Sequence, residues 1–499
     1  MTPVAKRAIR GAAWTIATSV GSRALGLIGT LAIVRYLRPD EFGEVSAASV
    51  VTLSANQIST LGTGMYVIAY PKAGRDKIFH ATAWHIASGA LALLAVVLLR
   101  GPLGPIFDSP LMGRFVPGLA LSVLLDRIGY VPERVLVRDL RFGQVSLART
   151  AGELGYTTVS VGTAMLGWGA MSIVYGNLAR SILRLVLTVA PVDRRDWCEP
   201  HPIRKQTLLE LLGYGTTVSI AGVAAFAQRR WDNLLVSRLF GPAVMGAYSL
   251  AYNLADIPAV QVGEQITDVL LASFAHVEAE NRERSLLRAT ALLGLIMFPL
   301  AVGLGATAPS IVRTFFDRKW ADVAPMLMLL SVLSVPRPVA GALTAYLHAM
   351  KRPRTVMWLE WFSVALLLGG IATVGRAGPR WACGAVGAAF CLRALATMWV
   401  IQRRDGTRVH AFLVKLLPPL GACLPMVAAI LIVRHGLGHV GVPSGVSLIA
   451  ETAVGGIVYV AAALVIARQA SRELIELARR GFARGQGAAH VQSADAAAG

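Results

Sequence analysis

The sequence predicts an all-helical protein that crosses a membrane many times, and three observations lead to this fold class. Only 15% of the 499 residues are charged, 55% are hydrophobic, and the mean hydropathy is +0.59. Soluble domains carry about 25% charged residues. A helix needs about 20 apolar residues to cross a bilayer, so the apolar content suffices for on the order of a dozen spans. A soluble globular fold is thereby excluded.

Apolar runs separated by charged or Pro/Gly-rich breaks place the spans in order along the chain. We expect about fourteen, at 13–35, 44–69, 80–99, 115–136, 147–167, 171–190, 212–237, 245–272, 289–314, 325–349, 357–375, 382–401, 412–433 and 446–467. The start MTPVAKRAIRGAAW is basic like a signal peptide, but a full-length span without a small-residue cleavage site follows it. The first helix is therefore expected to be retained.

Loop charges predict the orientation in the membrane. Loops on the amino-terminal side carry more than twice as many Lys and Arg residues as loops on the other side, an excess typical of the cytoplasmic face. Both termini are therefore expected in the cytoplasm. This explains most of the net charge of +20, so nucleic acid is not expected as a partner. Arginines after the last span are expected to contact membrane lipids.

An internal repeat is predicted by two segments that overlay without gaps at an offset of 203 residues. AIVRYLRPDEFGEVSAA overlays LVSRLFGPAVMGAYSLA, which aligns Pro39 with Pro242 and Gly43 with Gly246. Six spans separate the copies, so both run in the same direction and form a parallel repeat. Chance similarity of small-residue membrane helices is the alternative.

The repeat predicts two six-helix lobes with two further helices. The boundaries are 1–195 for the amino-terminal lobe, 196–402 for the carboxy-terminal lobe, 403–470 for two additional spans packed on the second lobe, and 471–499 for a tail. The tail is basic and then small and polar, a composition typical of disorder.

Three segments carry a family resemblance. LLGYGTTVSIAGVAAFAQRRWDNLLVSRLFGPAVMGAYSLAYNLADIP, FPLAVGLGATAPSIVRTFFDRKWADVAPMLMLLSV and LHAMKRPRT resemble the second half of bacterial polysaccharide transporters. These are the Wzx-type flippases of the multidrug/oligosaccharidyl-lipid/polysaccharide exporter superfamily. ALGLIGTLAIVRYLRPDEFGEVSAAS is similar to their opening helices, and the resemblance extends over residues 8 to 470.

This resemblance implies a function. It implies two six-helix lobes around a central cavity, alternating access, and movement of undecaprenyl-diphosphate-linked glycan units across the bacterial inner membrane. The polysaccharide would be O-antigen, capsule or exopolysaccharide. A polysaccharide polymerase and a chain-length regulator would be partners.

Charged residues inside the spans are the candidate functional residues. A central Arg costs roughly 2.5 to 3.5 kcal/mol in a bilayer and usually faces a cavity or a partner. A diphosphate headgroup suits the planar donor fork of Arg. The candidates for substrate binding are Arg23, Arg127, Arg180, Arg229, Arg230 and Arg337. Arg23 and Arg230 occupy related positions, since Arg23 aligns with Phe226, one helical turn before Arg230.

The alternative interpretation is that these charges form ion pairs within the helix bundle. Arg229 and Asp232 are three residues apart, and Asp126 adjoins Arg127. The acidic residues Asp232, Asp256 and Glu264 are candidates for coupling to protons or sodium, because a buried carboxylate can exchange a bound cation for cargo.

Two prolines predict an interrupted helix. Pro336 and Pro338 each remove a backbone donor and crowd an earlier carbonyl, so the span 325–349 should bend or break there. A break beside Arg337 could serve as a gate, whereas a packing kink is the alternative.

Some motifs are missing from the sequence. It has no G-x-x-x-x-G-K-[ST] phosphate loop, so hydrolysis of ATP by this chain is not expected. Its histidines and cysteines have no spacing typical of a metal site. Neither a cofactor nor a metal is expected.

Two other functions compete with the flippase. A multidrug/cation antiporter of the same superfamily would favour acidic cavities for its positive cargo, so the excess of arginine argues against it. A membrane enzyme such as an O-antigen ligase or polymerase would need large outer loops for a catalytic site. The predicted outer loops are short, so an enzyme is not expected.

The predicted orientation can be tested by reporter fusions or cysteine labelling. We expect a periplasmic signal at Pro39, Gly104, Asp317 and Gly438, and a cytoplasmic signal at Gly74, Asp196, Asn281 and Gly406. The excess of positive charge on the second group of loops is the physical reason. A consistent reversal of the two sets would contradict the topology.

Overall fold

The computed structural model describes residues 21, 25–26, 28–60, 62, 74–258, 263, 270, 274 and 277–476, and none of these lies in a strand. Their α-helices are α2 (Pro39–Ile58), α4 (Arg75–Leu98), α5 (Arg100–Ile106), α6 (Met112–Arg138), α7 (Phe142–Met165), α8 (Met171–Val189), α9 (Lys205–Pro258), α11 (Arg282–Phe315), α12 (Val323–Leu333), α13 (Pro336–Ala349), α14 (Pro353–Thr373), α15 (Pro379–Asp405), α16 (Val409–Val440) and α17 (Ser444–Ile466). Short 3-10 helices are η1 (Arg194–Asp196), η3 (Ala279–Asn281), η4 (Arg318–Trp320) and η5 (Val374–Ala377). The predicted all-helical fold class is confirmed.

Ten of the described helical stretches are long and apolar enough to cross a membrane. They begin at Arg75 and end at Ile466, and one of them, Ser219–Ile257, has the length of two spans. α2 and α7 are not among the ten; both contain charged residues, Glu44 in α2 and Arg149 and Glu153 in α7, together with several Ser, Thr and Gly residues. The chain is a multi-span membrane protein, in agreement with the sequence prediction.

The chain folds as two compact units. Unit 1 comprises Met1–Ala251, Phe315–Val323 and Glu360–Ala385, and unit 2 comprises Tyr252–Thr314, Ala324–Leu359 and Val386–Gly499. The helices α9, α14 and α15 therefore contribute residues to both units.

Local sequence explains where α2 begins and where α9 is interrupted. Pro39 is the first residue of α2, and the Glu41 carboxylate accepts a hydrogen bond from the Arg38 backbone N–H at 3.1 Å. Both features favour a helix start. Gly241 has φ 76, a left-handed conformation that interrupts α9. This break lies between the predicted spans 212–237 and 245–272.

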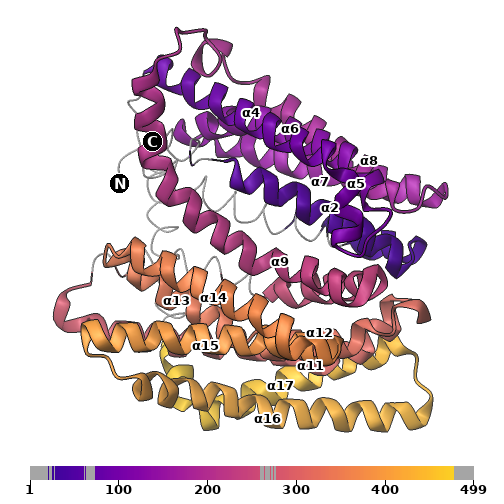
Figure 1. The fold of residues 1–499 in the computed structure, drawn as a ribbon. Coiled ribbons are helices and arrows are strands. Elements are labelled where there is room, and N and C mark those ends of the chain that lie inside the picture. The colour runs from indigo at the N-terminus through magenta and orange to yellow at the C-terminus, as the bar shows by residue number, and fades with distance from the viewer. Residues whose placement is uncertain are drawn as a thin grey trace, which may run out of the picture. The chain divides into compact units, whose positions relative to one another are not determined.

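In unit 1, α4, α6, α7 and α8 run alongside one another (Figure 1). α6 is the central helix of this group, since it packs against both α4 and α8. At one end, Ile78 of α4, Val131 of α6 and Leu211 of α9 are buried in one apolar cluster with Trp197. This cluster attaches the start of α9 to the amino-terminal helices.

The two segments of the predicted repeat cross each other at their glycines. A Cβ atom on Gly43 would run into the carbonyl oxygen of Pro242, and a Cβ on Gly246 would run into that of Pro39. The contact is reciprocal, because Gly43 faces Pro242 and Gly246 faces Pro39. The offset of 203 residues relates the two glycines to each other and the two prolines to each other. α2 and the second part of α9 therefore approach each other at backbone distance, which only glycine permits.

Two hydrogen bonds near this crossing are also related by the repeat. Trp320 Nε1 in η4 donates to the carbonyl oxygen of Val34 at 3.0 Å. Ser237 Oγ, which lies 203 residues after Val34, donates to the carbonyl oxygen of Phe107 at 2.8 Å. Each bond joins the end of the first span of one repeat to the loop after the third span of the other. The repeat therefore extends beyond the two glycines.

Unit 2 has an apolar core to which all its long helices contribute. Phe298 of α11, Leu343 of α13, Ile401 of α15, Phe412 of α16 and Tyr459 of α17 are buried in it. α16 and α17 lie side by side (Figure 1). Tyr459 also donates its hydroxyl to the carbonyl oxygen of Leu295 at 2.7 Å, so the two last spans pack on α11.

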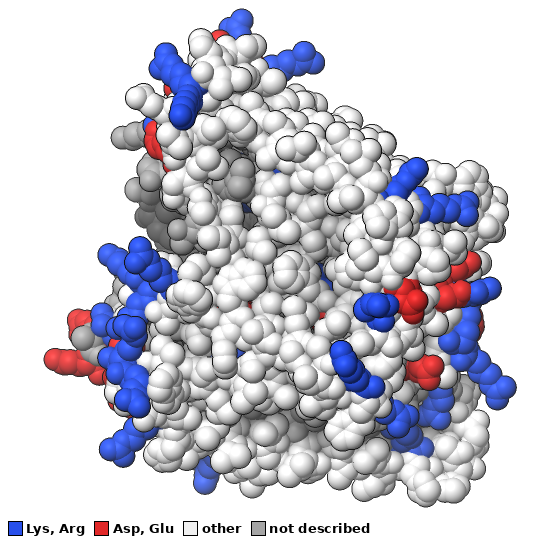
Figure 2. Space-filling model, in the orientation of Figure 1, with Lys and Arg blue, Asp and Glu red and all other residues white. Residues whose placement is uncertain are grey.

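Over unit 2, charged side chains gather toward the helix ends (Figure 2). The wide surface between those ends shows almost no Lys, Arg, Asp or Glu in this view. Large apolar side chains of α16 and α17, such as Leu424, Ile432 and Ile457, are about 70% exposed. An apolar surface between charged ends is the pattern expected for helices in a bilayer.

Replacing either crossing glycine should destabilise the protein. We expect Gly43→Ala and Gly246→Ala each to lower the free energy of unfolding by at least about 1–3 kcal/mol, because the added Cβ overpacks a backbone contact. Thermal denaturation in detergent, followed by tryptophan fluorescence, measures the effect. Gly162→Ala in α7 is the matched control, since a Cβ there meets nothing within 4 Å. Equal melting temperatures for all three variants would contradict the close crossing.

Candidate functional site

Four charged side chains of α6, α7 and α8 form a connected series inside unit 1, the α6–α8 charge network. The carboxylate of Glu133 pairs with Arg149 at 2.6 Å and with Arg184 at 3.1 Å. Arg184 also approaches Asp126 at 3.8 Å. Glu133 is buried. These contacts agree with the prediction that some intramembrane charges pair within the bundle.

Arg180, a predicted substrate ligand, lies next to this network. Its Nη2 pairs with Glu153 of α7 at 3.0 Å, and its guanidinium lies 4.1 Å above the ring centre of Tyr156. Its Nε is buried without a hydrogen-bond partner among the described residues. Arg180 therefore holds α7 and α8 together, and cargo would have to compete with Glu153 for it.

Arg127 is a buried arginine whose donors are used by neighbouring helices. It donates to Asn56 Oδ1 at 2.6 Å, to Ser59 Oγ at 2.5 Å and to the carbonyl oxygen of His85. Gly89 makes this position possible, because a Cβ there would run into the Arg127 side chain. The arginine thereby joins α6 to α2 and α4.

A cavity of about 270 Å³ lies beside Arg127. Its lining includes the polar residues Asn56, Gln57, Thr60, His85, Asp126 and Tyr130, with Ser219 from α9. Of the predicted substrate ligands in the described chain, Arg127 is the one that lines this cavity.

The predicted residues of α9 differ in their surroundings. Arg229 is exposed and Arg230 is half-buried, whereas Asp232 is fully buried. The Asp232 carboxylate accepts hydrogen bonds from the Tyr248 hydroxyl at 2.7 Å and from Asn233 Nδ2 at 3.0 Å. Two or more such donors compensate a buried carboxylate. The two arginines are thus the more accessible members of this group.

In unit 2 the structure brings together Arg337 and Asp256. Their side chains form an ion pair and are each 18% exposed. The Arg337 guanidinium also lies 5.4 Å from the ring centre of Phe390 and 5.9 Å from that of Tyr252. A predicted substrate ligand is therefore paired with a predicted ion-coupling residue.

The span that contains Arg337 is interrupted, as its prolines predict. α12 ends at Leu333 and α13 begins at Pro336. The backbone N–H groups of Ser334 and Val335 donate to carbonyls three residues back, each at 3.3 Å, instead of four. Such a tightened turn marks a helix break.

Two of the predicted site residues, Arg23 and Glu264, lie outside the described residues. The roles predicted for the other residues stay predictions.

Sequence reasoning missed a buried ion pair in the last two spans. Glu451 of α17 is fully buried and pairs with Arg434 of α16 at 2.8 Å. It also accepts a hydrogen bond from Ser310 of α11 at 2.6 Å. Glu451 stands in the middle of an apolar run, which is the signal that could have identified it.

These features define a multi-span helical membrane protein with paired charges inside its spans. The polysaccharide biosynthesis protein family matches residues 32–325, more than half of the chain. The chain belongs to this family. The resemblance to polysaccharide transporters noted in the sequence is thereby confirmed.

Curated relatives match along most of the chain. The succinoglycan biosynthesis transport protein ExoT of Rhizobium meliloti (strain 1021) is 26% identical over 497 residues, which cover 96% of this chain and 97% of ExoT. The lipopolysaccharide biosynthesis protein WzxC of Escherichia coli (strain K12) is 23% identical over 373 residues, 74% of this chain and 76% of WzxC.

Solved structures share the fold. The lipid II flippase MurJ in an inward closed conformation has a TM-score of 0.74 at 13% identity, covering 91% of this chain and 99% of MurJ. An inward-facing multidrug resistance MATE transporter has a TM-score of 0.65 at 15% identity, covering 77% and 94%. At these identities the likeness concerns the fold alone.

Removing the two prolines should join α12 and α13. In Pro336→Ala/Pro338→Ala, each alanine restores a backbone donor, and helix interiors favour Ala over Pro by about 3 kcal/mol. We expect amide hydrogen exchange over residues 331–339 to slow at least severalfold in the purified protein. Pro309→Ala is the control, because α11 continues through Pro309 without a break. Unchanged exchange would show that packing, not proline, sets the break.

Proposed function

We propose that this protein is a flippase that moves undecaprenyl-diphosphate-linked oligosaccharide units across the bacterial inner membrane. The observation that carries the proposal is the match to the transport protein ExoT over almost the full length of both chains. The likeness to a lipid II flippase and the many spans support it. The polysaccharide would be O-antigen, capsule or exopolysaccharide.

The transporter is favoured over an enzyme of the same pathway. ExoT is named as a transport protein and MurJ as a flippase. A flippase turns its cargo over without altering it, so neither a catalytic group nor a cofactor is required. Other components, such as a polymerase and a chain-length regulator, would act on the exported unit.

A cavity lined by arginines would hold the diphosphate headgroup. Arg127, Arg180 and Arg337 contact protein groups, whereas Arg229 is exposed and Arg230 half-buried. Arg23 and Arg230 are our first candidates for headgroup binding because of the internal repeat. Arg23 aligns with Phe226, one helical turn before Arg230, so the two arginines occupy related positions in the two lobes.

Acidic residues would couple transport to an ion. Asp232 is fully buried within α9 and is held by neutral donors, so a bound proton or sodium ion would not have to displace an arginine. Asp256 forms an ion pair with Arg337, and it would exchange this arginine for a bound cation. Glu264 is proposed for the same role on sequence grounds.

Alternating access would use the break between α12 and α13 as a gate. Pro336 and Pro338 keep this turn from closing into a regular helix, and Arg337 lies between them. The Pro336→Ala/Pro338→Ala variant should therefore also slow cargo turnover in reconstituted vesicles. The lobes bounded at 195 and 402 would be the moving parts, with both termini in the cytoplasm.

A multidrug/cation antiporter is the second candidate, because a MATE transporter shares this fold. The excess of arginine in the spans disfavours positively charged cargo. An antiporter would lower the toxicity of cationic drugs in a sensitive host, whereas we expect no such protection.

Export by arginine variants tests the proposed cavity. We expect Arg23→Gln and Arg230→Gln each to weaken headgroup binding roughly tenfold or more, the effect of losing a charge-assisted hydrogen bond. The lysine variants should be intermediate, because Lys keeps the charge but lacks the planar fork. Export of lipid-linked glycan is measured in a deletion strain at matched protein level.

Arg376→Gln is the matched control, since Arg376 is exposed in η5. Wild-type export by both glutamine variants and by the double variant would show that these arginines are structural. Lack of any glycan phenotype in the deletion strain would contradict the flippase itself.

A further inference from the structure

A second pocket, of about 410 Å³, lies in unit 2 where the ends of three spans meet. Arg284 and Arg288 belong to the first two turns of α11, and Lys415 lies near the start of α16. Arg468 follows the end of α17. The helix continues over residues 468–476 after a break at Ala467. Four cationic side chains thereby reach one pocket.

The charges of the pocket are not balanced. Glu473 is the one acidic residue among its lining residues, and it pairs with Arg288 at 2.8 Å. Lys415 Nζ donates to the neutral amide oxygen of Gln469 at 2.8 Å. Arg284 and Arg468 make no ion pair with any described residue. Three of the four cations therefore lack an acidic partner in the pocket.

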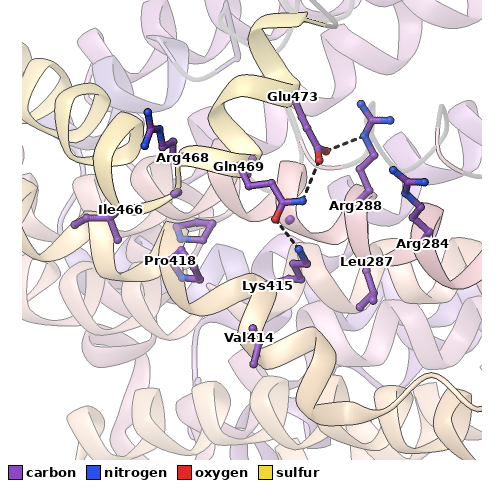
Figure 3. Close-up of a pocket in the computed structure, with 14 residues that line it drawn as sticks. Arg284, Leu287, Arg288, Val414, Lys415, Pro418, Ile466, Arg468, Gln469 and Glu473 are labelled. Carbon is purple, nitrogen blue, oxygen red and sulfur yellow. Dashed lines mark hydrogen bonds and ion pairs between the residues drawn. The ribbon is translucent and has the colours of Figure 1, made fainter.

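The pocket is also polarised. Figure 3 shows the guanidinium groups along the upper side of the pocket, with Arg468 at one end and Arg284 and Arg288 at the other, whereas Leu287 and Val414 lie on the lower side. Arg288 reaches toward Glu473, and Lys415 reaches toward Gln469. A ligand that fits must present an anionic group to the first side and an apolar part to the second.

Apolar surface continues from the pocket along α16 and α17. Val414, Leu417, Val465 and Ile466 are all exposed, with Val465 at 78%. Apolar residues exposed near the end of a membrane span contact lipid acyl chains. Arg and Lys side chains near the same end extend to the lipid phosphates. A lipid can therefore enter from the bilayer without crossing water.

We propose that this pocket binds the phosphate headgroup of an anionic bilayer phospholipid. The positive charges of Arg284, Lys415 and Arg468 around the pocket attract the anionic headgroup, a guanidinium group donates to its phosphate oxygens, and the acyl chains lie along α16 and α17. The proposal does not rest on the flippase function, because it concerns a lipid that stays bound and is not moved.

Lipid binding to the purified full-length protein tests the proposal. Native mass spectrometry compares phosphatidylglycerol with phosphatidylethanolamine, and thermal denaturation reports the stabilisation that follows binding. We expect preferential retention of phosphatidylglycerol by the wild type and roughly tenfold weaker binding by Arg284→Gln/Arg468→Gln. Arg284→Lys/Arg468→Lys should bind at an intermediate level, which shows that the site is intact.

Arg404→Gln/Arg408→Gln is the matched control, since it removes the same charge from exposed positions outside the pocket. An equal loss of phosphatidylglycerol binding in this control, or no loss in the pocket variant, would overturn the proposed site. Two further arms identify the source of the phosphate. Stabilisation by inorganic phosphate alone, or binding of undecaprenyl phosphate in preference to phosphatidylglycerol, would overturn the assignment to a bilayer phospholipid.

Discussion

The backbone contact between Gly43 and Gly246 is the constraint on which unit 1 depends. It brings α2 against the second part of α9 without any side chain between them, and the prolines that precede the glycines fix where each helix starts or turns. The hydrogen bonds of Trp320 to Val34 and of Ser237 to Phe107 are a second pair of contacts between the two repeats, since Val34 and Ser237 are also 203 residues apart. A duplicated segment therefore packs against its own copy. Because the two backbones are in contact, neither helix can slide along the other without a clash.

The charges inside the spans serve stability and constrain function at once. Glu133 and its arginines, Arg180 with Glu153, and Arg127 with its helix carbonyls join neighbouring helices where a bilayer offers no water to satisfy them. Removing one partner of such a pair leaves a buried charge, at a cost of about 3–5 kcal/mol. An arginine that holds helices together is thus a poor first ligand for cargo.

The last two spans have a different character from the rest. Their attachment to α11 uses the buried pair of Arg434 and Glu451 together with Ser310 and Tyr459. Their other faces expose long apolar side chains, and their ends form the basic pocket with Arg284 and Arg468. Such a surface suits contact with lipid more than contact with cargo. We therefore propose that the repeated helices carry out transport and that α16 and α17 contact lipid.

Sequence alone determined the helical membrane class, the repeat, the break at Pro336 and the family, because each depends on local composition or on spacing along one chain. It named Arg337 and Asp256 but assigned them separate roles, and only the tertiary structure showed them as one ion pair. It left Arg127 and Arg180 open between cavity and ion pair, and it passed over Glu451 and the pocket at Arg284. Pairing depends on which helix faces stand opposite each other, and a periodic pattern says which residues share a face but not what lies across from it.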